Sequence, residues 1–118
     1  MAKSQLRKLG YRFITEGVMS QTQLDNDGTV TIVWTDYMKY RAKLRGFDLA
    51  KIENIIRYSR ERYFDTATGR RVVAGRYGNM LVAIPYEVDQ HLIIPVTIHA
   101  TTRQQIRFRI RTGRYTIE

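Results

Sequence analysis

A histidine and the arginines that follow it are the residues best suited to chemistry in this chain of 118 residues. His99 precedes a basic segment that contains Arg103, Arg107, Arg109, Arg111 and Arg114, with no acidic residue before Glu118. Positive neighbours disfavour the cationic form of an imidazole, so we expect His99 to stay neutral and able to accept a proton. Arginines bind phosphate oxygens and stabilise the charge that gathers on them. The alternatives are a structural hydrogen bond for His99 and a merely solvated face for the arginines.

Basic and tyrosine side chains elsewhere extend the same chemistry. We expect His99 or Tyr77 to transfer protons, and Arg76 and Arg103 to hold and neutralise a phosphate. Basic residues that are interleaved with aromatic ones can follow a phosphate backbone while bases stack. The residues expected to bind nucleic acid are Lys39, Arg41, Arg70, Arg71, Thr102, Arg107, Arg109 and Arg111.

Several other chemistries have no residues to support them. The chain has no cysteine and only two histidines, so we expect neither a metal site nor a cysteine nucleophile. It also lacks a glycine-rich phosphate loop and a GxSxG nucleophile motif, and we expect no cofactor. Arginine, histidine and tyrosine suffice for one reaction, the cleavage of RNA in which the 2′-hydroxyl is the internal nucleophile.

The net charge restricts the kinds of partner. Twenty Lys and Arg against 11 Asp and Glu give a formal charge of +9. A domain this basic is a candidate for nucleic acid, an anionic membrane surface or an acidic protein. Neither a secretory signal nor an apolar run of about 18 residues occurs, so we expect a cytoplasmic protein without a membrane partner. We expect residues 1–118 to form one domain, with residues 1–10 as a mobile basic arm.

The first half of the chain predicts a strand followed by two helices. Residues 29–35 alternate β-branched side chains, as a strand does. Thr35 or Asp36 can cap a helix that ends at Gly46, and Asp48 can cap a second helix. The side chains that share one face of the first helix are Tyr37, Tyr40, Arg41 and Leu44, and the apolar stripe of the second is Leu49, Ile52, Ile55 and Ile56.

The second half predicts an antiparallel meander. Strands are expected at 70–76, 80–86 and 92–99, with Pro85 and Pro95 at a bulge or an open edge. In the last of these strands Ile94, Val96 and Ile98 would share one face, opposite Pro95, Thr97 and His99. Residues 102–112 can form a helix capped by Thr101 or Thr102 and ended by Gly113, or a strand in which Ile106, Phe108 and Ile110 alternate. The predicted fold class is α+β, with a two-helix hairpin on an antiparallel sheet of about four strands.

Three stretches resemble the BrnT-like toxins of the broad RelE/ParE-like group of bacterial toxin–antitoxin systems. They are residues 35–48 (TDYMKYRAKLRGFD), 68–78 (TGRRVVAGRYG) and 95–103 (PVTIHATTR). The basic or polar residues that match are Arg70, Arg76, Thr102 and Arg103. Many relatives have a histidine where Tyr37 stands and another where Arg45 precedes Gly46. The resemblance implies a RelE-like fold, a cytoplasmic ribonuclease and a co-expressed antitoxin that neutralises it.

The sequence therefore predicts the toxin component of a type II toxin–antitoxin system, a metal-independent endoribonuclease. Its expected partners are RNA and a cognate antitoxin, and the sequence leaves a homodimer open. Two alternatives remain, a nucleic-acid-binding module that does not cleave and a protein-interaction subunit with a basic surface.

Overall fold

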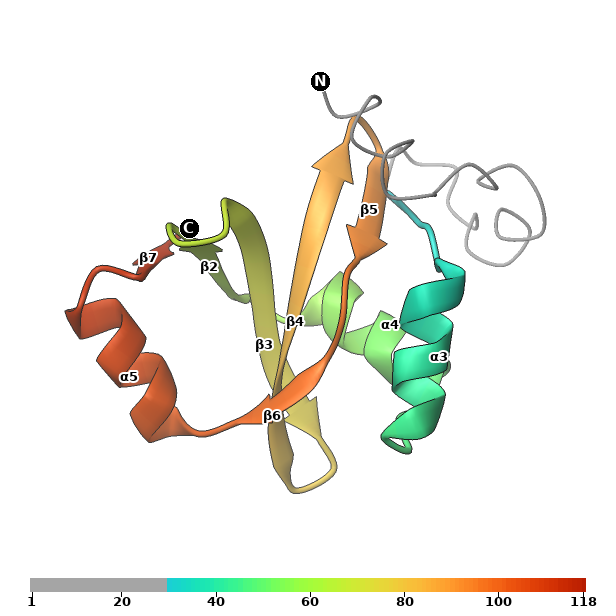
Figure 1. The fold of residues 1–118 in the computed structure, drawn as a ribbon, viewed down its shortest axis with the longest axis horizontal. Helices are drawn as coiled ribbons and strands as arrows, with labels where there is room; N and C mark the ends of the chain where they lie inside the picture. The colour runs from blue at the N-terminus through green and yellow to red at the C-terminus, as the bar shows by residue number, and fades with distance from the viewer. Residues whose placement is uncertain (1–29) are drawn as a thin grey trace.

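A β-sheet with helices on both of its faces makes up residues 30–118, the part of the chain that the computed structural model describes (Figure 1). The expected basic arm at residues 1–10 lies outside the described residues, as does Thr29 of the first expected strand. The elements in chain order are β1 (Thr31–Ile32), α3 (Asp36–Leu44), α4 (Leu49–Tyr58), β2 (Glu61–Asp65), β3 (Arg70–Tyr77), β4 (Met80–Asp89), β5 (Leu92–Pro95), β6 (His99–Thr101), α5 (Arg103–Arg111) and β7 (Tyr115–Ile117). The α+β class is thus confirmed.

The sheet is larger than predicted and is not wholly antiparallel. Within residues 30–118 it has seven strands, in the order β1-β5-β4-β3-β2-β7, with β6 paired to β4. The pair β1–β5 is parallel, whereas the other pairs are antiparallel. The expectation of about four antiparallel strands is therefore wrong. The edge strands β1 and β7 have two and three residues, too short for an alternating pattern to identify them.

The expected strand at 92–99 is interrupted, because β5 ends at Pro95 and β6 begins at His99. Both segments pair with β4, where Pro95 lies opposite Tyr86 and His99 lies opposite Ala83. The three residues 96–98 therefore face only two residues of β4, 84 and 85, as in a β-bulge. The prediction that prolines mark a bulge is confirmed.

This bulge reverses the predicted alternation of side chains. Ile93 and Ile98 belong to the same core cluster, whereas the sequence pattern placed Ile98 on one face with Ile94. An inserted residue shifts the side chains after it to the other face of the sheet, because strand side chains alternate with a period of two. The predicted face of Ile94, Val96 and Ile98 is wrong for this reason.

The helical hairpin α3–α4 covers one face of the sheet. The Thr35 side chain caps α3 by accepting a hydrogen bond of 3.0 Å from the Met38 amide, and Gly46 ends it with φ +76°. In α4 the predicted apolar stripe is confirmed, since Ile52, Ile55 and Ile56 are buried and Leu49 packs beside them. The buried residues of α3 are Met38 and Ala42, which leaves its predicted face of Tyr37, Tyr40 and Leu44 exposed.

Helix α5 covers the other face, so the sheet has a core on each side (Figure 1). Consecutive residues of β3 and β4 alternate between these two cores. The α5-side core consists of Tyr63, Val72, Ala74, Leu81, Ala83, Ile106 and Tyr115. Residues 102–112 are helical rather than extended, because the Thr102 hydroxyl caps the Gln105 amide and Ile106 and Ile110 face the sheet one turn apart. Gly113, with φ +83°, follows the helix as predicted.

Among residues 30–118, the structure has no helix whose length and apolar content would allow it to span a membrane.

Candidate functional site

His99 lies on the α5 face of the sheet. The Cα partners across neighbouring strands place Glu61, Ala74, Ala83 and His99 in one row. Ala74 and Ala83 belong to the α5-side core, and side chains that pair directly across a sheet share a face. Arg109 of α5 lines the same pocket as His99, so the histidine faces the basic helix.

A pocket of about 180 Å³, lined mainly by polar and charged residues, lies beside the imidazole. The bulge and β6 bring Thr97 and His99 to it, α5 brings Arg109, and the turn after α5 brings Arg114. The pocket is lined by Asp65, Thr68, Arg70, Pro85, Val96, Thr97, His99, Arg109, Arg114 and Tyr115. The Thr97 hydroxyl is buried and has no hydrogen-bond partner within residues 30–118.

The pocket arginines differ in how far their charge is already balanced. Arg114 donates two hydrogen bonds to Asp65, at 2.9 and 3.0 Å, and Arg70 donates one to Glu87 at 3.1 Å. Arg109 forms no ion pair in the described part of the chain, and its guanidinium lies 5.5 Å from the centre of the Tyr115 ring. Arg109 is therefore the pocket cation best placed to bind an incoming anion.

The buried carboxylate in this pocket is held in its charged form. Burial raises the pKa of Asp65, but hydrogen bonds from Arg114 and the Ala67 amide outweigh this, and the net pKa falls below its usual value. Asp65 thus fixes Arg114 at the pocket wall and does not compete as a proton donor near neutral pH.

The same surroundings keep His99 neutral. Burial lowers the pKa of His99, and the positive charges of Arg109, Arg45 and Arg41 lower it further. Arg45 also donates a 2.7 Å hydrogen bond to the Ile98 carbonyl, which ties the residue before His99 to α3. The expectation of a neutral imidazole beside arginines is therefore supported by the geometry.

This pKa shift predicts a stability difference between wild type and His99→Gln. In the unfolded chain His99 takes up a proton near its ordinary pKa of 6.5, while in the folded protein it does so only at lower pH. The unfolded state then binds more protons, so wild-type stability should decline, relative to the variant, as the pH falls below about 6.5. Urea unfolding at pH 5, 6, 7 and 8 would measure the difference. Parallel profiles for the two proteins would contradict the shift.

Arg103, expected at the catalytic centre, is engaged with a carboxylate of the neighbouring sheet. Its guanidinium donates to both oxygens of Glu61, at 2.5 and 2.9 Å, and the Tyr63 hydroxyl donates to the same carboxylate at 2.6 Å. The hydrogen bond from Arg103 lowers the pKa of Glu61. Burial, together with the hydrogen bond that Tyr63 donates to Glu61, raises the pKa of Tyr63 to about 12. Arg103 therefore ties the start of α5 to β2, and a phosphate would have to displace Glu61 to reach it.

The other two expected catalytic residues lie away from the pocket. Arg76 is on the α5 face but two residues along the sheet from the row of His99, opposite Leu81 and Thr101, and it donates to the Asn79 carbonyl at 3.4 Å. Tyr77 packs on the α3–α4 side, where its hydroxyl accepts a 2.7 Å hydrogen bond from the Asp48 amide. The structure thus brings His99 together with Arg109, but not with Tyr77.

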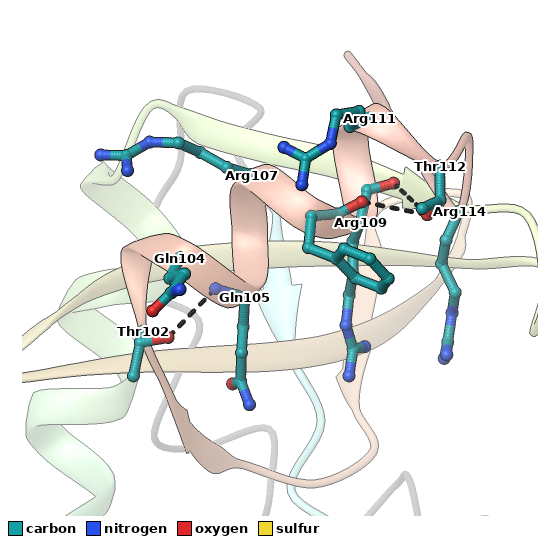
Figure 2. Close-up of a pocket in the computed structure, with 9 residues that line it drawn as sticks. Thr102, Gln104, Gln105, Arg107, Arg109, Arg111, Thr112 and Arg114 are labelled. Atoms are coloured by element: carbon teal, nitrogen blue, oxygen red, sulfur yellow. Dashed lines mark hydrogen bonds between the residues drawn. The ribbon is translucent and has the colours of Figure 1, made fainter.

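The residues expected to bind nucleic acid are spread over both faces. Arg107, Arg109, Arg111 and Thr102 line a hollow along α5 (Figure 2). Arg70 lines the His99 pocket, whereas Arg71 is exposed and pairs with Glu118 at 3.5 Å. Lys39 and Arg41 belong to α3, on the other side of the sheet. The sequence analysis did not assign Thr97, Asp65 or Arg114 to a site, although it placed Thr97 on one face with His99 and counted Arg114 in the basic segment. No sequence signal pointed to Asp65.

Comparisons with known proteins add no relative. No protein-family model matches the chain, and neither a curated protein nor a solved structure matches it. Within residues 30–118 no three His, Cys, Asp or Glu side chains are grouped as metal ligands would be. Function is therefore inferred from the site itself.

Proposed function

We propose that this protein is the cytoplasmic toxin component of a type II toxin–antitoxin system and acts as a metal-independent endoribonuclease. The observation that carries the proposal is the pocket that Arg109 and a neutral His99 line together, in which Arg109 forms no ion pair with any residue of 30–118. A helical hairpin on one face of the sheet and a basic C-terminal helix also agree with the RelE-like arrangement that the sequence resemblance implies. The net charge of +9 favours an RNA substrate.

The proposed reaction uses the RNA 2′-hydroxyl as nucleophile. His99 accepts the proton of this hydroxyl, the bond from O2′ to phosphorus forms, and the bond from phosphorus to O5′ breaks. Arg109, which lines the same pocket as His99, stabilises the negative charge that develops on the phosphoryl oxygens. The departing O5′ takes a proton from solvent. The products are a 2′,3′-cyclic phosphate and a 5′-hydroxyl.

The exposed face of α3 is where we place the antitoxin. Tyr37, Tyr40 and Leu44 are 55, 60 and 63% exposed and share one side of the helix, at the spacing that an amphipathic partner segment needs. Arg41 and Lys43 flank this apolar stripe. Their charge favours an acidic amphipathic segment of the antitoxin, which would neutralise the toxin while bound on the far side of the sheet from His99.

Incubation of the purified protein with mixed RNA in EDTA tests the proposed activity. We expect cleavage that leaves 2′,3′-cyclic phosphate ends, and that is lost in Arg109→Ala but kept in Lys39→Ala, since Lys39 lies on the opposite side of the sheet. Binding without cleavage, weakening steeply with salt, would replace the nuclease with a binding module. Neither binding nor cleavage would leave an acidic protein partner as the reason for the charge.

A further inference from the structure

A second and larger hollow lies along the outer side of α5. It measures about 760 Å³ and is lined by Thr102, Gln104, Gln105, Arg107, Phe108, Arg109, Arg111, Thr112 and Arg114 (Figure 2). All of these residues belong to α5, its N-cap or the turn that follows it. The hollow is open to solvent along one helix, which suits an extended ligand rather than an enclosed small molecule.

Phe108 is the unusual residue of this surface. Its side chain is 56% exposed, although the apolar side of the same helix, with Ile106 and Ile110, packs on the sheet. The Arg111 guanidinium lies 5.8 Å from the centre of the Phe108 ring. An exposed aromatic ring beside arginines is the combination on which nucleobases stack in single-strand binding proteins.

The polar residues around the ring are available for a ligand. Arg107 and Arg111 form no ion pair within residues 30–118. Gln105 accepts a hydrogen bond from the Thr101 hydroxyl at 3.1 Å, whereas the Gln104 amide has no such bond in the described part of the chain. A free amide can read the edge of a base, and free guanidinium groups can bind the phosphates on either side of it.

Two arginines connect this hollow to the His99 pocket. Arg109 and Arg114 line both cavities, and Figure 2 shows their side chains extending in the same direction, while Arg107 extends away from them. An anion held at Arg109 would therefore lie at the boundary between the two cavities.

We propose that Phe108 is a stacking platform for an unpaired base of single-stranded RNA, whose neighbouring phosphate is held by Arg109 at the mouth of the His99 pocket. The proposal rests on the proposed ribonuclease function and specifies its substrate as single-stranded. Bases in an RNA duplex are stacked on one another and have no free face for the ring.

The composition of the surface favours RNA over a protein partner. Phe108 is the one exposed large apolar side chain of α5, whereas α3 exposes three at helical spacing. A single ring gives a partner helix no apolar stripe to pack against, but it is sufficient for one base.

Binding of a fluorescently labelled RNA 12-mer, in EDTA and with His99→Gln present in every protein to prevent cleavage, tests the platform. We expect Phe108→Ala to weaken binding of the single strand by about 5- to 100-fold, the effect of losing one stacked base. Phe108→Trp should retain binding. Tyr58→Ala is the matched control, because Tyr58 is an aromatic side chain, 72% exposed, on α4, and it should leave binding unchanged.

Three outcomes would overturn the platform. They are unchanged binding by Phe108→Ala, equal affinity for the same sequence as a duplex, and Phe108-dependent binding of an oligoglutamate peptide instead of RNA, which would assign the surface to an acidic protein. Failure of the ribonuclease proposal is separate. If the wild-type protein leaves RNA intact while single-strand binding still depends on Phe108, the stacking role of Phe108 is supported and the proposed cleavage is refuted.

Discussion

His99→Gln is expected to lower the rate of RNA cleavage by about 10²- to 10⁴-fold, the usual contribution of a positioned general base. Glutamine keeps most of the size and the hydrogen-bonding capacity of the imidazole but cannot accept the proton at neutral pH. The pocket walls come from the bulge, α5 and the turn after it, so they should survive the substitution. Single-turnover cleavage of a labelled RNA, with saturating protein, would isolate the chemical step from binding.

His91→Gln is the matched control, because His91 is the other histidine of the chain and is exposed beyond the end of β4. It should cleave at the wild-type rate. Equal rates for wild type and His99→Gln, with both proteins folded, would remove the imidazole from the mechanism and leave only a binding role for the arginines around it.

Ile98→Ala is expected to lower the free energy of unfolding by about 2–5 kcal/mol, as large-to-small substitutions in tight cores do. Ile98 is 0% exposed and is the last residue of the bulge between β5 and β6. Its side chain packs in the α3–α4-side core and holds residues 96–98, which belong to no strand, against the sheet. The loss should also loosen the adjoining His99, so cleavage should fall together with stability.

Urea unfolding at neutral pH would measure this effect, with Ile117→Ala as the control. Ile117 is 73% exposed on β7, so the same chemical change there should alter stability by no more than about 0.5 kcal/mol. Similar losses at the two positions would mean that the bulge is not held by burial of Ile98.

The capping and glycine signals in the sequence predicted the helices well, because a helix end depends on residues that are close together in the chain. Thr35 and Thr102 cap their helices as expected, and glycines follow both helices with positive φ. The bulge was only half predictable. Pro95 marks where strand pairing stops, but the number of residues before pairing resumes depends on the partner strand β4.

The same distinction applies to the site. His99 and Arg109 were identified by residue type, and strand β6 and helix α5 bring them to one pocket. The pairing of Arg114 with Asp65 joins positions 49 residues apart, so it follows from the order of the strands and not from any local pattern. The pairing of Arg103 with Glu61, 42 residues apart, was missed for the same reason. Because Arg103 is paired, Arg109 is the better candidate to bind a phosphate.

Both outer strands of the sheet within residues 30–118 pair with segments that are distant in the sequence. Thr31 pairs with Leu92, so β1 emerges from the ribosome long before its partner β5. Strand β2 pairs early with β3, but its other edge stays unpaired until Tyr115 of β7 reaches Asp65. Contacts this distant in sequence form slowly, and an unpaired strand edge stays exposed meanwhile. Strand β7, which pairs with β2, follows directly after helix α5 with Arg109 and the turn with Arg114. A nascent chain would therefore lack part of the pocket wall until the segment that carries Arg109, Arg114 and Tyr115 had been made.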